Sequence, residues 1–387
     1  MLQGTPFCNL NCSYCDLSAT SRKRRVEMPL ELLEHTFREV FSSDHICSDL
    51  SIVWHSGEPL TLSPNYYQDA IDIISRLRDE LAPGRVALSF DFQTNGLLIS
   101  EEWVRFFDRN RHQLHLGVSV DGPAEIHDAF RLNWGGKPTF SKVERGMTLL
   151  KEAGIPFKII SVVTDATLRQ PDLYFDFILD WYRSLSGFHF NILADGSLAD
   201  QPGLTYDRAD RDRYYTFYRH LLSRARAAEA QFQGFSVQNF GQALSRILAR
   251  ESDPVSHSSL PLRSLNVDVE GYVTTFYAGL ERGTFADLYG DGDGLALGNI
   301  RTTSLRDMVA SPKLQQMMLD FSRSHAACHQ NCDYYALCSG GFELAQYKAH
   351  NHFEGGETAE CAIIVKTLID AVLDDVADVS DRHRKAS

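Results

Sequence analysis

The 387-residue sequence lacks several features that define large classes of proteins. No stretch approaches the roughly 18 consecutive apolar residues of a membrane-spanning helix. The first residues, MLQGTPFCNLNC, have neither the basic nor the apolar segment of a secretory signal peptide. We therefore expect a cytoplasmic protein with no membrane partner.

Positive charge is also scarce. The chain has 38 Lys and Arg against 51 Asp and Glu, a formal net charge of -13. A nucleic-acid-binding protein would present a basic face, so we expect no nucleic-acid partner. The one basic run, RKRR over residues 22–25, is predicted to be a solvated loop. Contact with an acidic peptide or a redox partner is the alternative.

Cysteine is infrequent but clustered. Of eight cysteines, three lie within residues 8–15 and four within residues 328–361, while Cys47 stands apart. In a chain without a secretory signal, this distribution indicates metal or redox chemistry rather than disulfides. We interpret Cys47 as a partly buried, unreactive thiol.

Apolar runs alternate with helical patterns over the first half of the chain. The predicted strands are residues 2–7, 50–55, 86–94, 114–121, 157–163 and 188–193. The predicted helices are residues 29–41, 65–81, 101–109, 140–153 and 171–184. Six β-α repeats predict an α/β fold with a parallel sheet, too few to close an eight-stranded barrel, so we expect an open partial (β/α)6 barrel. Its site should lie at the carboxyl ends of the strands.

The rest of the chain divides into smaller units. Residues 207–250 are predicted to form two helices, residues 265–276 a β-hairpin, and residues 361–377 an amphipathic helix. The loop over residues 290–298 resembles the start of a calcium loop, but position 302 is Thr where an acidic residue should close it. We predict domains at residues 1–195, 196–262 and 263–387.

The first cysteine group has the spacing C-x3-C-x2-C, formed by Cys8, Cys12 and Cys15. A [4Fe-4S] cluster normally takes four thiolates, so three in one short loop leave one iron open to another ligand. The loop follows the first predicted strand, where ligands bind in such sheets. A structural zinc site lacking one ligand, or a chance grouping, is the alternative.

This motif resembles the signature of the radical S-adenosylmethionine (SAM) family. The segments HSGEP at 55–59, QTNG at 93–96 and SVDGP at 119–123 resemble further motifs of that family, each after a predicted strand. The resemblance implies a SAM-binding [4Fe-4S] cluster and a 5′-deoxyadenosyl radical that abstracts hydrogen from the substrate. It implies SAM contacts at Tyr14, Gly57, Glu58, Thr94, Ser119, Arg131 and Leu193.

The second cysteine group comprises Cys328, Cys332, Cys338 and Cys361. Four thiolates are typical of structural zinc, which is the alternative here. The segment resembles the SPASM extension of peptide-modifying radical enzymes, which usually carries seven cysteines for two auxiliary [4Fe-4S] clusters. In this sequence Phe276 and Phe342 occupy two of the expected cysteine positions. We therefore predict one auxiliary cluster, and two clusters in total.

Nearly the whole chain resembles the cyclophane-forming peptide maturases associated with glycine-rich repeat precursors. That resemblance implies a crosslink between an aromatic ring carbon and the β-carbon of a nearby residue. It also implies two partners: a precursor peptide with a leader and an aromatic-containing core, and an electron donor such as flavodoxin or ferredoxin. Alternatives are a thioether, an epimerised residue, another carbon-carbon bond, a sulfatase-maturase-like oxidation, or a non-catalytic iron-sulfur carrier.

Tyr277 stands where sulfatase-maturing relatives place a catalytic aspartate, which argues against that oxidation. A ring-attacking reaction needs a base, and the candidates are Asp121, His55 and Tyr277. A structural role is the stronger interpretation of each. With seven residues before Cys8, we expect the body of the enzyme, residues 207–250 included, to recognise the precursor.

Overall fold

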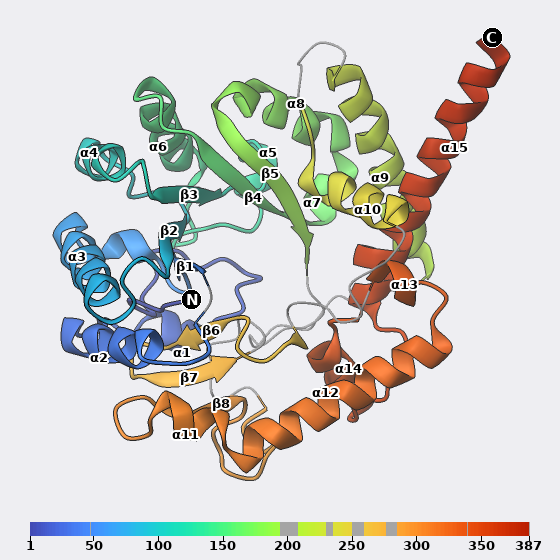
Figure 1. Cartoon of the computed structure of the whole chain (residues 1–387). Coiled ribbons are helices and arrows are strands. Elements are labelled where there is room, and N and C mark those ends of the chain that lie inside the picture. The colour runs from blue at the N-terminus through green and yellow to red at the C-terminus, as the bar shows by residue number, and fades with distance from the viewer. Residues whose placement is uncertain are drawn as a thin grey trace.

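The computed structural model describes residues 1–46, 48–193, 208–229, 235–249, 259–275, 285–338 and 340–386. Its main sheet has five parallel strands in the order β1-β2-β3-β4-β5. They are β1 (Asp49–Trp54), β2 (Ala87–Thr94), β3 (Leu114–Ser119), β4 (Phe157–Val163) and β5 (Leu185–Ile192). The strands form an open arc, with helices on its outer side (Figure 1). This architecture confirms the predicted partial barrel.

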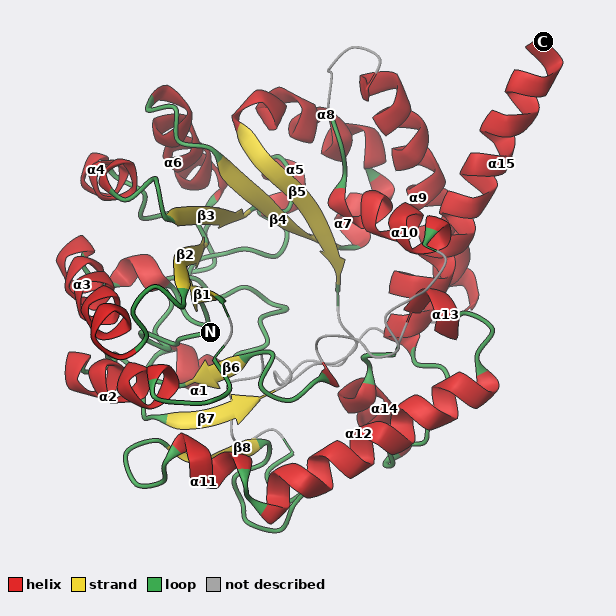
Figure 2. Cartoon of the chain, viewed as in Figure 1, coloured by secondary structure: helices red, strands yellow, loops and turns green. Residues whose placement is uncertain are grey.

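Five longer helices precede or connect the strands on the outer side of the arc (Figure 2). They are α2 (Leu30–Phe41), α3 (Pro64–Leu81), α4 (Glu101–Arg109), α6 (Phe140–Glu152) and α8 (Pro171–Trp181). An aromatic cluster joins β1 and β2 to α3 and α4: Tyr67 packs edge-on against Trp54 and Phe92, with ring centroids 5.0 and 4.7 Å away. Burying each such ring contributes roughly 1.5–3 kcal/mol, which fixes this end of the sheet.

The predicted strand over residues 2–7 is wrong. Only Leu2 pairs, through isolated parallel bridges to Trp54 of β1 and to Val267. Pro6 has no amide hydrogen for a ladder, and the chain then turns into the cysteine loop. The N-terminal segment therefore links the main sheet to a second one instead of adding a full sixth strand.

Other boundaries differ slightly from the sequence patterns. β5 begins at Leu185 rather than 188, β3 ends at Ser119 rather than 121, and α8 ends at Trp181. Short helical turns not predicted from the sequence are α1 (Ala19–Arg22), η1 (Pro59–Thr61), α5 (Ala124–His127), α7 (Asp165–Arg169) and η2 (Tyr182–Ser184). Turns of three to five residues carry too little periodicity to be visible in a sequence.

A second, antiparallel sheet contains the predicted hairpin. Its strands are β6 (Leu265–Val267), β7 (Tyr272–Thr275) and β8 (Ala296–Asn299). Asp268 closes the turn, since its carboxylate accepts hydrogen bonds from the backbone N–H of Glu270 (2.9 Å) and Tyr272 (2.8 Å). β8 overlaps the end of the loop predicted over residues 290–298, so that prediction is wrong over residues 296–298. Phe276 and Cys47 lie outside the described residues.

The two predicted helices after the barrel are present as α9 (Arg208–Glu229) and α10 (Gln238–Leu248). The Asn239 side chain accepts from the N–H of Phe190 at 3.0 Å and donates to its carbonyl at 2.8 Å. These two bonds cover the outer edge of β5. The predicted domain boundary at 195–196 lies outside the described residues, and the one at 262–263 stays a prediction.

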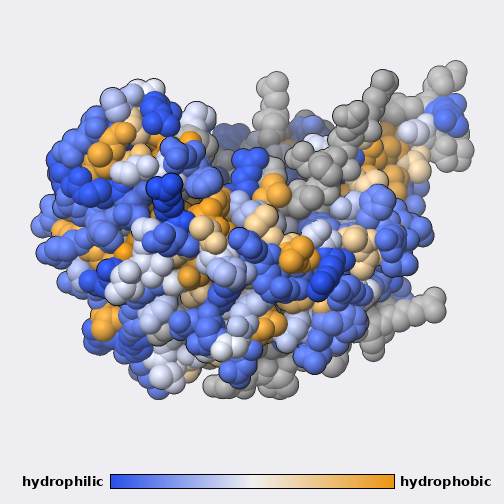
Figure 3. Space-filling model, turned by 60° about the horizontal axis from the view of Figure 1, so that its bottom comes forward, coloured by the Kyte–Doolittle hydropathy of each residue, from blue (hydrophilic) through white to orange (hydrophobic). Residues whose placement is uncertain are grey.

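The C-terminal part is mostly helical: α11 (Leu305–Val309), α12 (Pro312–Asn331), α13 (Tyr335–Cys338), α14 (Glu343–His350), a π-helix (Cys361–Thr367) and α15 (Leu368–Ala386). The helix predicted over residues 361–377 starts as a π-helix over Cys361–Thr367 and continues as α15 to Ala386, beyond the predicted end. α15 packs against α9 and extends from the body (Figure 1). Figure 3 shows hydrophilic residues over most of the face it draws. Among the described residues, no helix is long and apolar enough to cross a membrane.

Candidate functional site

The first cysteine group lies on the loop between the N-terminal segment and α1, and its three thiols are free. The backbone of Cys8 is held from both sides. Its N–H donates to the carbonyl of Arg22 at 3.0 Å, and its carbonyl accepts from the indole N–H of Trp134 at 2.9 Å. Burial raises the pKa of all three thiols, that of Cys12 to about 11, so binding a metal cluster there must release protons.

Arg22 corrects the prediction of a merely solvated basic run. Its side chain is 5% exposed and donates to the carbonyls of Leu17 (2.9 Å) and Leu10 (3.3 Å). The next residue, Lys23, is exposed and lies 4.8 Å over the Trp134 ring. The run therefore braces the cysteine loop through its first residue and faces solvent afterwards.

Glu58 lies at the end of β1, 1% exposed, in a cage of neutral donors. Its carboxylate accepts from the N–H of Leu60 (2.9 Å), the hydroxyl of Thr94 (2.6 Å) and the N–H of Asn95 (2.7 Å). Burial outweighs these bonds and raises the pKa of Glu58 to about 7. Within the described part of the chain no Lys, Arg or His pairs with it, and a cationic ligand such as an amine would favour its charged form.

Gly57 lets this carboxylate approach the cysteine loop. Its φ is +96°, and a Cβ built there would lie 2.2 Å from the carbonyl oxygen of Thr5. Only glycine fits without moving backbone. The N–H of Glu58 in turn donates to the carbonyl of Phe7 at 2.8 Å, directly before the first cysteine.

Asn95 connects Glu58 to the cysteine loop, and it was not among the predicted site residues. Its side-chain amide donates to Asn9 at 2.7 Å and lies 3.8 Å from the Cys8 sulfur, while its backbone N–H binds Glu58. Thr94, which was predicted to touch SAM, uses its hydroxyl to position Glu58. Asn95 lies in the quoted QTNG segment, so the signal for it was present but was assigned to its neighbour.

Asp121, Arg131 and Tyr14 form a second buried group. The Arg131 guanidinium binds both carboxylate oxygens of Asp121, at 2.9 and 3.0 Å, and the Tyr14 hydroxyl also donates to this carboxylate. The N–H of Val162 on β4 donates to it at 2.9 Å. Burial alone would raise the pKa of Asp121, but the charge of Arg131 and these bonds hold it below its usual value. Such a carboxylate positions its neighbours; as a base it stays a weak candidate.

The other predicted residues are placed separately. The Ser119 hydroxyl accepts from the Gln93 amide at 2.7 Å, and the N–H of Leu193 donates to the carbonyl of Val163 at 3.2 Å. Burial lowers the pKa of His55 to about 4, so its ring is neutral. Tyr277 lies outside the described residues.

The structure thus brings the carboxyl ends of β1 to β4 together with the cysteine loop. Glu58 follows β1, Thr94 ends β2, Ser119 ends β3, and Asp121 is bound by backbone of β4. These ends were predicted to carry the site because parallel strands present them at one edge. No described contact joins Leu193 to this group.

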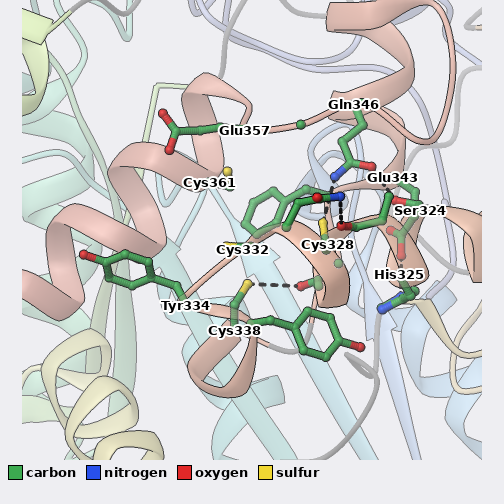
Figure 4. A pocket seen from close by; sticks show the side chains of 18 of the residues that line it. Ser324, His325, Cys328, Cys332, Tyr334, Cys338, Glu343, Gln346, Glu357 and Cys361 are labelled. Carbon is green, nitrogen blue, oxygen red and sulfur yellow. Dashed lines mark hydrogen bonds and ion pairs between the residues drawn. The ribbon is translucent and has the colours of Figure 1, made fainter.

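The second cysteine group lines a cavity of about 260 Å³ between α12, α13 and the π-helix (Figure 4). Cys328 lies near the end of α12, Cys332 caps that helix, Cys338 ends α13, and Cys361 begins the π-helix. Burial raises the pKa of Cys338 to about 11. All four predicted ligands therefore surround one space, although α12 itself was not predicted.

Polar groups support these thiols. The amide of Gln346 donates to the Cys328 sulfur at 3.1 Å, and the N–H of Thr358 donates to the Cys361 sulfur at 3.3 Å. Lys366 also lines the cavity and pairs with Glu357 at 2.7 Å. Sequence reasoning missed Gln346, because nothing in the chain marks residue 346 as a neighbour of residue 328.

Four thiols around one cavity can serve as the ligands of a [4Fe-4S] cube or of one structural zinc ion. Within the described ranges, no three Cys, His, Asp or Glu side chains gather closely enough to hold one metal ion.

Comparison with known proteins agrees with this geometry. Residues 2–181 match the model of the Radical SAM superfamily. The chain is 28% identical over 375 residues to an uncharacterised protein of Synechocystis sp., covering 96% of this chain and 90% of that protein. It is 26% identical over 341 residues to the cysteine-type anaerobic sulfatase-maturating enzyme of Clostridium perfringens, covering 86% and 85%. A serine-type enzyme of Bacteroides thetaiotaomicron is 31% identical over 234 residues, covering 59% and 50%.

The fold is shared with solved structures. Native anSMEcpe with bound AdoMet and Kp18Cys peptide superposes with a TM-score of 0.78 at 22% identity, over 98% of each chain. SuiB of Streptococcus suis superposes with a TM-score of 0.58 at 15% identity, over 93% of this chain and 74% of that one. These likenesses confirm the partial barrel with a SPASM-type extension. Residues 2–181 are a radical SAM domain, and the protein is a radical SAM enzyme.

Proposed function

We propose that this enzyme modifies a ribosomally made peptide and joins an aromatic ring carbon to the β-carbon of a nearby residue. The observation that carries the proposal is the pairing of two unequal cysteine sites in one fold. One is an open triad beside a buried carboxylate, and the other is a cavity lined by four thiols. Such a pairing supplies a radical site and one redox-active neighbour.

The triad and the strand ends are suited to hold a [4Fe-4S] cluster and SAM. Cys8, Cys12 and Cys15 would ligate three irons, and Glu58 would bind the methionine amine. When bound, this pair supplies a 5′-deoxyadenosyl radical that abstracts hydrogen from an unactivated carbon. Glu58 orients the ligand, and the buried Asp121–Arg131 pair keeps the Tyr14 ring in place beside it.

A peptide substrate is supported by the fold. The solved structures of native anSMEcpe that match over 98% of this chain include complexes with the Cp18Cys and Kp18Cys peptides. We place the precursor of this enzyme in the same class of ligand. A flavodoxin- or ferredoxin-like donor stays the predicted source of the electron.

The choice of a crosslink rests on the sequence. Of the eight cysteines, three form the triad and four line the cavity, so only Cys47 is left. One cysteine is too few to hold a second auxiliary cluster. Position 277 is Tyr where the sulfatase-maturing pattern has Asp. Both features match the cyclophane-forming group better than the sulfatase-maturing one.

A sulfatase-maturase-like oxidation is the second candidate. It is favoured by 26% identity over 86% of the chain to the cysteine-type enzyme of Clostridium perfringens. Such an enzyme would oxidise a serine or cysteine side chain and would leave no bond between residues.

The test is anaerobic incubation of the reconstituted enzyme with SAM, a reductant and the precursor peptide encoded beside it, followed by tandem mass spectrometry. We expect loss of two hydrogens and no fragment ions between an aromatic residue and its partner, because the crosslink holds both fragments together. A peptide lacking the partner residue is the matched control and should stay unmodified.

The second candidate gives a different result. A serine oxidised to an aldehyde also loses two hydrogens, but it fragments normally and reacts with a hydrazine probe. An aldehyde, a thioether or an epimerised residue would contradict the crosslink and leave the radical chemistry standing. Absence of 5′-deoxyadenosine under every condition would contradict both.

A further inference from the structure

Two buried polar side chains form a hydrogen-bonded chain that ends on the sulfur of a predicted cluster ligand. The Ser324 hydroxyl donates to the side-chain carbonyl of Gln346, whose amide donates to the Cys328 sulfur at 3.1 Å (Figure 4). Ser324 and Gln346 are each 3% exposed. No backbone requirement explains a glutamine amide aimed at a thiol in this position.

The geometry fixes which end of the amide faces the sulfur. Ser324 and Cys328 lie four residues apart on α12, so they share one face of that helix. A hydroxyl that gives its proton to the carbonyl oxygen of Gln346 leaves only the amide N–H groups to face Cys328. Ser324 therefore locks Gln346 as a donor to the sulfur.

Charged side chains also line the cavity. Lys366 pairs with Glu357 at 2.7 Å and still favours the thiolate forms of Cys328 and Cys361. The buried pair of His325 and Glu343, 2.7 Å apart, lines the same space. The amide of Gln346 differs from these charges because it is a direct hydrogen-bond donor to the sulfur of Cys328. Hydrogen bonds to the sulfurs are one of the means by which a protein sets the potential of an iron-sulfur cluster.

We propose that Ser324 and Gln346 raise the reduction potential of the auxiliary cluster held by Cys328, Cys332, Cys338 and Cys361. Reduction adds negative charge to the cluster and its thiolates, and an N–H donor stabilises the reduced state more than the oxidised one. The inference rests on the proposed function, since it requires an iron-sulfur cluster in this cavity. Both residues act as positioning residues.

A raised potential suits an electron acceptor. Once the substrate carbon radical has bonded to the ring, the adduct must lose one proton and one electron to restore the aromatic system. The electron would pass to the auxiliary cluster held by the four thiols and from there to the oxidised form of the flavodoxin- or ferredoxin-like carrier, while the proton passes to solvent. The crosslink forms, a C–H bond of the ring breaks, and the charges balance.

The test is a redox titration of the full-length protein with both clusters reconstituted, followed by electron paramagnetic resonance. The signal that SAM does not change belongs to the auxiliary cluster. We expect Gln346→Leu to make its reduction about tenfold less favourable, a potential about 59 mV lower for one electron. Ser324→Ala should lower it by a smaller amount, since the amide can then rotate.

The controls are Gln330→Leu and Ser322→Ala, exposed residues on the same helix as Cys328. Neither should move the potential, and the triad cluster should not shift in any variant. An unchanged reduction potential of the auxiliary cluster in Gln346→Leu would overturn the proposed role of the Ser324–Gln346 hydrogen bonds. If that variant fails to assemble its cluster, Ser324→Ala decides, and an unchanged potential there overturns the proposal.

The proposed function fails in a different way. If the wild-type protein holds about four irons, enough for one cube, and shows no second resonance, both the auxiliary cluster and the role of Ser324 and Gln346 are rejected. If both clusters are present but their potentials do not shift in the variants, only the role of Ser324 and Gln346 is rejected.

Discussion

The two cysteine sites are built on opposite plans. The triad lies on a loop whose backbone is bound to Arg22, Trp134 and the ends of parallel strands, and it provides three thiols. The C-terminal site lies on helices around a cavity and provides four. Three thiols leave an iron open for a ligand, whereas four close the cluster. One site is therefore suited to binding and the other to electron transfer.

The polar surroundings differ in the same sense. Beside the triad, Glu58 is a buried carboxylate that no described cation pairs with. Around the cavity, the charged side chains occur in pairs, Lys366 with Glu357 and His325 with Glu343, and the sulfur of Cys328 receives a neutral donor. A charged ligand is expected at the first site and none at the second.

The largest expected effect separates the sites directly. Cys12→Ala should abolish 5′-deoxyadenosine formation, because the two thiolates that remain are too few to hold the cluster. Cys332→Ala should still cleave SAM but should lose the crosslinked product. Chromatography of 5′-deoxyadenosine and mass spectrometry of the peptide measure both. Equal loss of SAM cleavage in the two variants would break the comparison.

The next effect concerns the stability of the barrel edge. Asp121→Asn leaves Arg131 buried without its carboxylate, and we expect it to lower the free energy of unfolding by about 3 kcal/mol. Asp79→Asn, at an exposed pair with Arg78, should change it by less than about 1 kcal/mol. Urea denaturation of the cluster-free protein gives both values. A small change at Asp121 would mean that Asp121 is not held as the structure has it.

Glu58→Gln tests the charge at the triad. Losing a charge-assisted hydrogen bond costs about 1.5–3 kcal/mol, so we expect SAM to bind about 10- to 100-fold more weakly. Glu357→Gln, the matched change in the cavity, should leave SAM binding unaltered. Calorimetric titration of SAM into the reconstituted enzyme measures the affinity. Equal affinities in the two variants would contradict the assignment of Glu58.

The effect that is smallest per pH unit is a dependence of stability on pH. Burial, and then the charge of Arg131, lowers the pKa of His127 from 6.5 to about 4. The folded state then binds fewer protons than the unfolded state, so stability is present above pH 6.5 and falls as the pH drops toward 4. The loss is about 1.4 kcal/mol per pH unit.

His127→Gln isolates this term, since a glutamine has no charge to gain. Its amide can replace the ring as acceptor from the N–H of Asp121 (3.4 Å) and donor to Thr139 (3.2 Å). The free energy of unfolding, measured at several pH values, should fall less steeply with decreasing pH in the variant than in the wild type. The same slope in both proteins would show that His127 titrates normally.

The sequence predicted the fold class and most strands of the barrel, because these depend on residue type and spacing; the assignment of the cysteines as cluster ligands stays a prediction. It was wrong about residues 2–7, where a proline and the turn into the cysteine loop prevent a strand. It also treated the basic run as solvated, although Arg22 is buried. Whether an arginine folds inward depends on carbonyls elsewhere in the chain, which no local pattern shows.

What the sequence by itself determined is the chemistry available: three thiols close together, four more near the end, and motifs after successive strands. Only the tertiary structure decided how that chemistry is directed. It placed Asn95 between Glu58 and Cys8, and it aimed Gln346 at Cys328 from a separate helix. The physical reason is that hydrogen-bond partners are set by distance and orientation in space, whereas spacing along the chain fixes neighbours only within one helix or strand.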